Sequence, residues 1–311
     1  MTAYLEACRS GRLRERIGAA VSLLESCRVC PHNCGVNRLV GEAGRCRTGR
    51  EAIVSSYGPH FGEEAPLVGK HGSGTIFFAN CNLTCLFCQN YSISQLGEGQ
   101  EVRKEELAGM MLALQAKGCH NINLVSPTHV VPQILEALEL AVQLGLHLPL
   151  VYNSGGYDSV QTLRMLDGIV DIYMPDMKYD DEGIARELSG IENYPEINRA
   201  AIKEMHRQVG DLEMNQEGVG QRGLLVRHLV LPHGLAGTRG VVDFLSKEIS
   251  RNTYVNIMGQ YHPCYRAFQV PSLGRGVSSS EFLEALVLAG EAGLSRLDKA
   301  HPVRILRMCS E

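Results

Sequence analysis

The chain has no long hydrophobic run, no signal-like leader and no large charge excess, and each absence excludes a class of protein. None of its apolar runs approaches the ~20 residues that span a bilayer. Charged residues interrupt the short apolar patches of residues 1–26, so the apolar region of a signal peptide is missing. A formal net charge of −4 favours neither a nucleic-acid nor an anionic-membrane partner. We therefore expect a cytoplasmic protein with no membrane and no nucleic-acid partner.

The chain also lacks internal repeats and low-complexity tracts. With 311 residues, 44% of them hydrophobic, it can bury a sizeable core in one large domain or two ordinary ones. Its 11 cysteines would indicate disulfides in a small secreted protein. In a large cytoplasmic protein they indicate metal ligation or redox chemistry instead. Their gathering into two groups supports that interpretation.

The first group is formed by Cys27, Cys30, Cys34 and Cys46, which follow an expected helix at residues 4–26. Four cysteines in so short a segment suit one metal ion or cluster, and the glycines among them would give little regular structure without it. Zinc and an iron–sulfur cluster are both open as occupants, and His32 is an alternative ligand. A purely structural zinc site and four unliganded thiols also remain open.

The second group is formed by Cys81, Cys85 and Cys88, directly after the apolar run at residues 75–79. A strand that leads three soft thiolates into one loop, with no fourth cysteine close by, suggests an iron–sulfur cluster with one iron left open. That open iron would hold a reactive small-molecule ligand.

Strand and helix patterns alternate from residue 72 onward. We predict strands at 75–80, 121–125, 148–153, 169–174, 224–231 and 253–258, and helices at 103–117, 130–144, 159–166, 181–209 (broken near 190–195), 241–250 and 280–292. Such alternation gives six βα units and a parallel sheet with right-handed crossovers. We therefore predict an α/β fold, a partial (β/α)6 TIM-like barrel with its chemistry at the C-terminal strand ends. Residues 211–222 are expected to form an exposed hairpin or loop. The predicted division is an N-terminal helix and four-cysteine segment at 1–70 and a core with a C-terminal extension at 71–311.

The three-cysteine loop, with Phe77-Phe78-Ala79-Asn80 before it and Gln89-Asn90 after it, resembles the radical S-adenosylmethionine (radical SAM) superfamily. Within that superfamily it looks like the activating enzymes of pyruvate formate-lyase and their uncharacterised homologues. The four-cysteine segment is similar to that of one branch of these homologues. The resemblance covers residues 72–263 and 27–49, and it implies a barrel of the radical SAM type.

The resemblance also implies the chemistry. Cys81, Cys85 and Cys88 would ligate a [4Fe–4S] cluster whose open iron chelates S-adenosylmethionine. Reductive cleavage of that cofactor would give a 5′-deoxyadenosyl radical for hydrogen abstraction, while the protein orients the cofactors and excludes water. An electron donor such as flavodoxin or ferredoxin is implied.

Further site residues follow from the resemblance and from the strand ends. By resemblance, Phe87 lies beside the adenine, and Asp176 and Lys178 contact the methionine part of the cofactor. Asn153 and Ser154 are candidates for hydrogen bonds to the ribose or carboxylate. The remaining polar candidates near strand ends are His228, Gln260 and His262 for cofactor binding, and Arg227 and Arg266 for a carboxylate. A structural or surface role stays open for each histidine and arginine.

One loop departs from the family pattern. Relatives usually carry a Gly-Gly-Glu-like run after the second strand, which holds the cofactor's amino group. This chain has Ser126-Pro127-Thr128-His129 there, which offers hydrogen-bond acceptors but no fixed negative charge. Its cofactor contacts and the substrate stay undetermined. Activation of a glycyl-radical enzyme, modification of another protein, peptide or small molecule, and a non-catalytic zinc protein are the hypotheses left open.

Overall fold

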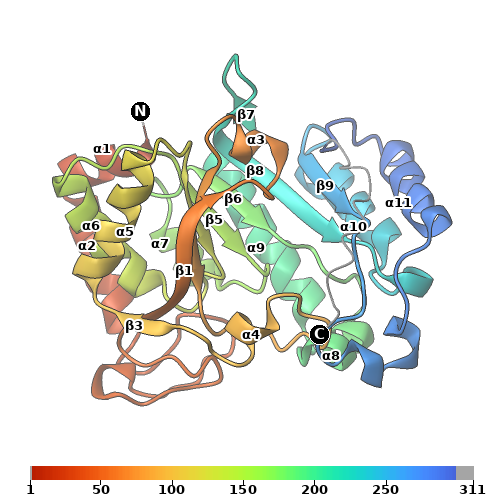
Figure 1. The fold of residues 1–311 in the computed structure, drawn as a ribbon, viewed down its shortest axis with the longest axis horizontal. Coiled ribbons are helices and arrows are strands. Elements are labelled where there is room, and N and C mark those ends of the chain that lie inside the picture. The colour runs from red at the N-terminus through yellow and green to blue at the C-terminus, as the bar shows by residue number, and fades with distance from the viewer. Residues whose placement is uncertain (1, 299–311) are drawn as a thin grey trace.

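The computed structural model describes residues 2–298, in which nine strands form one sheet (Figure 1). The strands are β1 (Ala52–His60), β2 (Ser73–Phe78), β3 (Gln100–Val102), β4 (Ile122–Val125), β5 (Leu150–Ser154), β6 (Ile172–Pro175), β7 (Glu213–Met214), β8 (Gly220–Leu229) and β9 (Tyr254–Met258). Their order is β3-β1-β2-β4-β5-β6-β8-β7, with β9 paired to β8. The run β2-β4-β5-β6-β8-β9 is parallel, and no pairing closes the sheet among the described residues. The predicted α/β fold, an incomplete barrel with a mostly parallel sheet, is confirmed.

Most of the helices connect the parallel strands and cover the outer face of the sheet, whereas the short α3 and α4 lie at the barrel interior and at the cysteine loop. They are α1 (Ala3–Arg9), α2 (Arg12–Ser22), α3 (Ala65–Val68), α4 (Tyr91–Ser94), α5 (Lys104–Ala116), α6 (Val131–Gln143), α7 (Val160–Met165), α8 (Glu182–Ser189), α9 (Tyr194–Val209), α10 (Thr238–Phe244) and α11 (Ser279–Glu291). Short 3₁₀ or π turns occur at η1 (Arg38–Val40), η2 (Pro232–Gly234), η3 (Leu245–Ile249), η4 (Ala267–Gln269) and η5 (Pro271–Leu273). None of the helices in residues 2–298 combines the length and apolar character that a membrane crossing requires.

Several predicted elements have different bounds. The single helix expected at 4–26 is two helices, because Gly11 adopts a left-handed conformation (φ 79°) between α1 and α2. Residues 211–222 do form a hairpin, since β7 pairs antiparallel with the start of β8. Strands β1 and β3 were not predicted, and β1 pairs antiparallel with β2. The division of the chain after residue 70 stays a prediction, and residues 299–311 of its second part lie outside the described residues.

Alternation along each parallel strand separates the outer core from the barrel interior. Ile122 and Leu124 of β4 belong to the large core under the helices. Val151 of β5, Leu225 of β8 and Tyr254 of β9 pack instead with Leu67 of α3 in a smaller cluster. That cluster forms the apolar floor of the barrel interior, below the C-terminal strand ends.

The segment between β1 and β2 lies across the open side of this interior. Asn121 Nδ2 donates to the carbonyl of Leu67 at 2.9 Å, which ties α3 to the start of β4. Glu64, just before α3, accepts a hydrogen bond from Asn256 of β9 at 3.0 Å. In Figure 1, α3 lies beside β7, in front of the first part of β8. This segment therefore links the two ends of the open sheet.

Candidate cofactor site

The three-cysteine loop follows β2 at the C-terminal edge of the parallel sheet. Asn80 starts the loop in a left-handed conformation (φ 64°), which asparagine tolerates better than most residues. Further along, Thr84 N and Leu86 N donate to the carbonyls of Ser189 (3.2 Å) and Leu188 (2.8 Å) at the end of α8. Because both sides of the loop are tied down, an irregular segment holds a defined shape.

The thiols of this loop line one cavity of about 260 Å³. The cavity is lined by Cys81, Leu83, Cys85, Phe87, Cys88, Gln89, Asn90, Ser94, Gln95, Val125, Ser126, Asn153, Ser154, Gly155, Asp176, Lys178, Arg227, Leu229, Met258 and Gln260. The C-terminal ends of five parallel strands (β4, β5, β6, β8 and β9) and the cysteine loop thus converge, as the parallel topology requires. The volume is close to the lower end of ordinary ligand pockets, roughly 300–1,000 Å³.

Two of the thiols have hydroxyl partners. Ser189 Oγ donates to Cys85 Sγ at 2.9 Å, and Cys88 Sγ lies 3.0 Å from Ser94 Oγ. Burial raises the pKa of Cys81 to about 12, although the backbone N–H of Leu83 and, less strongly, Lys178 act against that rise. Burial likewise raises the pKa of Cys85, against the charge of Lys178. A positive charge beside buried thiols favours their thiolate form, which is the form that binds metals.

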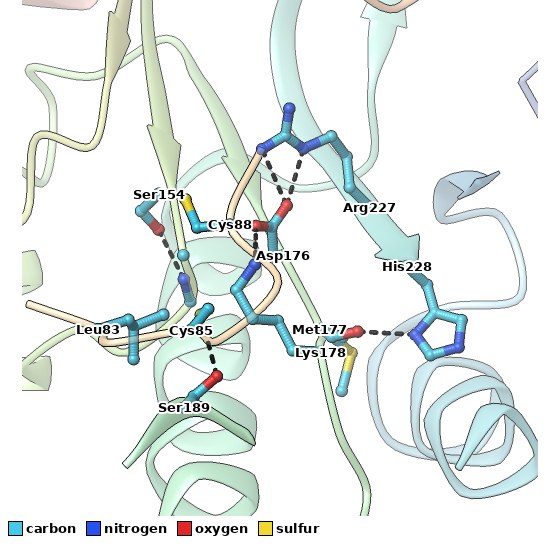
Figure 2. Close-up of polar contacts among 12 residues, drawn as sticks. Leu83, Cys85, Cys88, Ser154, Asp176, Met177, Lys178, Ser189, Arg227 and His228 are labelled. Atoms are coloured by element: carbon cyan, nitrogen blue, oxygen red, sulfur yellow. Dashed lines mark hydrogen bonds and ion pairs between the residues drawn. The ribbon is translucent and has the colours of Figure 1, made fainter. Parts of the chain in front are cut away.

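An array of charged side chains forms the opposite wall (Figure 2). Lys178 Nζ donates to Asp176 Oδ2 at 2.6 Å, and Arg227 Nε donates to Asp176 Oδ1 at 2.9 Å. Burial alone would raise the pKa of Asp176, but Arg227 and Lys178 outweigh it and hold the pKa below its usual value. The charges are therefore paired within the array. Arg227, predicted as a carboxylate ligand, is already bound to Asp176 and, through Nη2, to Asn153 Oδ1 at 2.8 Å.

Phe87, Ser154 and Gln260 also line the cavity where they were predicted. The ring of Phe87 meets those of Tyr179 and Tyr261 edge-on, at 6.4 and 5.8 Å between centroids. Ser154 Oγ donates to Asp158 Oδ2 at 2.6 Å, so its proton is committed inside the protein. The Ser154 hydroxyl oxygen keeps acceptor capacity only.

The structure places His228 elsewhere. Its ring is fully buried, with Nδ1 2.7 Å from the carbonyl of Met177 and Nε2 2.9 Å from Thr238 Oγ1. Burial lowers its pKa. Neighbouring residues of a strand point to opposite faces of the sheet. Since Arg227 points into the cavity, His228 points outward (Figure 2). This placement argues for a structural role and against a cofactor contact.

Two further candidates lie at the rim or outside it. His262 is exposed, and its Nδ1 lies 3.4 Å from Nε2 of the cavity residue Gln89. Arg266 is exposed and stacks its guanidinium over Tyr265, 5.0 Å from the ring centroid. Neither side chain is in the cavity wall.

The departing loop contributes one residue, Ser126, to the cavity wall. Thr128 Oγ1 donates to Asp158 Oδ1 at 2.7 Å, and the buried His129 lies 3.1 Å from the carbonyl of Ala79. Burial, with the nearby Arg38, lowers the pKa of His129 to about 3. His129 is therefore neutral and structural, and the loop supplies no charge to the cavity.

The segment that carries the four N-terminal cysteines lies beside this site. Burial raises the pKa of Cys30 to about 12, and the neighbouring thiols of Cys46, Cys27 and Cys34 add to the rise. The backbone N–H of Arg45 points at Cys34 Sγ, 3.4 Å away. Cys27, Cys30 and Cys46 are buried, as metal-binding thiols commonly are.

The four-cysteine segment contacts the three-cysteine loop directly. His32 Nε2 lies 2.7 Å from the carbonyl of Asn82, and Arg47 Nη2 donates to Asn80 Oδ1 at 2.9 Å. The ring of His32 also lies 5.3 Å from that of Tyr157. One ring nitrogen of His32 is thus engaged in the contact, which leaves only the other for a metal.

Within residues 2–298, no three histidine, cysteine, aspartate or glutamate side chains lie together in the manner of the ligands of a single metal ion. The donor set of the cavity nevertheless fits an iron–sulfur cluster and a polar cofactor: three thiols from one loop face a wall of carboxylate, amine and amide groups. We therefore regard Cys81, Cys85 and Cys88 as the residues that would hold the cluster.

Sequence reasoning missed several members of the cavity. Ser94 and Gln95 reach it from α4, and Met258 and Leu229 from the ends of β9 and β8. Strand-end position would have identified the last two. Nothing in the sequence marks Ser94, because its contact with Cys88 depends on the fold of the loop.

Comparison with known proteins identifies a family that part of this chain matches. Residues 75–217 match the family described as the Radical SAM superfamily. An uncharacterized protein of Methanocaldococcus jannaschii is 33% identical over 300 residues, which cover 93% of this chain and 82% of the relative.

Solved structures are more distant. The crystal structure of a radical SAM methyltransferase from Sphaerobacter thermophilus has a TM-score of 0.49 and 15% identity over 71% of this chain. The FeFe-hydrogenase maturase HydG from Carboxydothermus hydrogenoformans has a TM-score of 0.45 and 14% identity over 70% of this chain. The chain spans 64% and 50% of those two proteins.

Proposed function

This chain belongs to the radical SAM superfamily, and on that premise we propose that it reductively cleaves S-adenosylmethionine and uses the radical to abstract hydrogen from a substrate. The superfamily employs a [4Fe–4S] cluster and S-adenosylmethionine. The observation that carries the proposal is the single cavity shared by Cys81, Cys85 and Cys88 with the polar strand ends.

In this proposal the residues of each wall of the cavity have a distinct role in holding the cofactors. When bound, the two cofactors supply one-electron cleavage of a sulfonium bond, which the side chains cannot perform. The three cysteines hold the cluster, and Ser189 donates a hydrogen bond to Cys85 Sγ, which orients that sulfur. Asp176 and Lys178 offer both signs of charge to a zwitterionic ligand. Leu83 and Phe87 cover the loop with apolar surface and keep water away.

Removal of one cluster cysteine tests the assignment. Cys85→Ala in anaerobically reconstituted protein should lower reductive cleavage of S-adenosylmethionine to the background rate, because two thiols cannot hold the cluster in place. Cys8→Ala, which changes a half-buried thiol outside both groups, is the matched control and should cleave normally. Cleavage by Cys85→Ala at the wild-type rate would contradict the proposal.

The substrate class is proposed from the residues around the three-cysteine loop. The residues around the three-cysteine loop resemble activating enzymes of pyruvate formate-lyase, which favours a glycyl-radical enzyme as partner. Shared fold and cofactor do not determine substrate, so another protein, a peptide or a small molecule is the alternative. A glycine-centred radical signal in a candidate partner after incubation with the reduced enzyme would decide for the first class. An electron donor such as flavodoxin or ferredoxin belongs to either version.

A second metal at Cys27, Cys30, Cys34 and Cys46 is part of the proposal, with zinc or an iron–sulfur cluster as occupant. Its support is the electrostatic effect of Cys46, Cys27 and Cys34 on the buried Cys30 thiol and the N–H of Arg45 that faces Cys34. Little regular structure holds this segment, since η1 is its one helical turn among the described residues. A bound metal would supply the missing cross-links.

A further inference from the structure

Two adjacent glutamates lie behind the charged wall of the cavity. Glu63 and Glu64, on the segment that crosses the open side of the barrel, are 9% and 5% exposed. Asn256 Nδ2 donates to Glu64 Oε1 at 3.0 Å, and Arg227 Nε lies 3.9 Å from the same oxygen. Glutamates are almost never this buried unless they are paired.

The two carboxyl groups are neighbours in the chain and act on each other. Glu64 raises the pKa of Glu63 through its charge and its side chain, and a hydrogen bond between two carboxyl groups would require a proton on one of them. The second oxygen of Glu64, Oε2, is buried and has no hydrogen-bond partner within residues 2–298. A protonated Glu63 therefore supplies the donor that Glu64 otherwise lacks.

The charges around the pair also favour a proton on Glu63. Burial raises the pKa of Glu63 to about 7; Glu64 and Asp176 add to the rise, and Arg227 opposes it. The ionisable groups that face the pair are Arg227 on β8, Asp176 after β6 and Tyr254 on β9. With one proton on the pair, the charges of Glu64 and Asp176 balance those of Arg227 and Lys178.

The pair is placed to act through Arg227. Arg227 and Met258 line the cavity, and Asn256 lies two residues before Met258 on the same face of β9. Glu64 thus approaches Arg227 from the barrel interior, while Asp176 holds Arg227 from the cavity wall. A change in the charge of the pair therefore reaches Asp176 through Arg227 as well as directly.

We propose that Glu63 and Glu64 are a proton-sharing positioning pair, which holds Arg227 and so sets the orientation and charge of the Asp176–Lys178 ion pair that faces the cofactor. The proposal deepens the proposed function, since it takes S-adenosylmethionine as the ligand of the cavity. Loss of the shared proton adds a negative charge behind Arg227. Affinity for the cofactor should consequently change with pH near neutrality, through residues that do not touch it.

The sign of the effect on stability follows from the raised pKa. Between the ordinary glutamate pKa, about 4.3, and about 7, the folded chain retains a proton that the unfolded chain has lost. This group therefore contributes most at low pH, and its contribution falls as pH rises through that window. Glu63→Gln keeps a donor for Glu64 at every pH and should abolish this part of the pH dependence.

Infrared difference spectra of the purified chain between pH 6 and pH 8 test the pair without any cofactor. The wild type should lose carbonyl intensity of protonated carboxyl groups as pH rises. Glu63→Gln should lose less of it, because Asp171, whose pKa burial raises to about 6, titrates in both proteins. Glu98→Gln, which changes an exposed glutamate in the loop after α4, is the control and should lose as much as the wild type. Equal losses in the wild type and in Glu63→Gln would overturn the shared proton.

The coupling to the cavity is tested by the affinity of the reconstituted protein for S-adenosylmethionine across the same pH range. The wild type should show a transition near pH 7, Glu63→Gln a flat profile close to the protonated wild type, and Glu63→Ala weaker binding. An unchanged transition in Glu63→Gln would overturn the positioning role. Failure of the wild type to bind at any pH would refute the proposed function instead, and the infrared result would stand separately.

Discussion

At the scale of single residues, the charged side chains of the cavity wall neutralise one another. Asp176 accepts from both Lys178 and Arg227, and removal of one partner of a buried ion pair leaves an uncompensated charge. The alternation of side chains along β8 decides which polar residues take part: Arg227 faces the cavity and His228 the outer core. The sequence places both at one strand end, but the direction of each side chain follows only once the strand register is known.

Asp176→Asn should lower the free energy of unfolding by about 3–5 kcal/mol, because two buried cations lose their shared anion. Because the pKa of Asp176 is depressed, its contribution is present above the unfolded pKa of about 3.9 and is lost as pH falls through the folded value. Urea unfolding at pH 7 measures the loss.

The matched control is Asp243→Asn, which removes an exposed i,i+4 partner of Lys247. It should cost no more than about 0.5 kcal/mol. Equal losses for the two variants would contradict the view that Asp176 neutralises the wall.

At the scale of elements, periodicity identified the six parallel strands because each is a short apolar run between helices. It missed β1, whose sequence AIVSSYGPH carries serine, glycine and proline and is half exposed as an antiparallel neighbour of β2. Periodicity also predicted one helix in place of α1 and α2, since their apolar residues keep helical spacing across Gly11. The three-cysteine loop was found because its ligands are close in sequence, whereas the Glu63–Glu64 pair acts through residues about 160 and 190 positions away.

The close approach of Gly44 to Cys34 gives a prediction for the four-cysteine segment. A Cβ on Gly44 would lie 2.7 Å from Cys34 Sγ, so Gly44→Ala should displace that thiol and weaken the N-terminal metal about 10–100-fold. Gly49→Ala is the matched control, because nothing lies within 4 Å of the added Cβ. Metal analysis after dialysis against a chelator measures the difference. Retention of the same metal content by both variants would argue against a metal held at Cys34.

At the scale of the whole molecule, the two cysteine groups belong to one assembly. The N-terminal segment contacts the three-cysteine loop through His32 and Arg47, and the strand ends complete the cavity from the other side. The open side of the sheet is crossed by the segment that carries Glu63 and Glu64. We infer that the chain forms a container around the cysteine loop, with its charge balance set from the barrel interior.

The central claim is that Cys81, Cys85 and Cys88 hold an iron–sulfur cluster independently of the N-terminal cysteines. The most direct test is the iron, sulfide and zinc content per chain of anaerobically purified wild type and of the double variant Cys27→Ala/Cys30→Ala. The account predicts that the double variant retains about four irons and about four sulfides per chain and loses only the metal of the first group. Zinc without iron or sulfide in the wild type, or loss of all iron in the double variant, would contradict it.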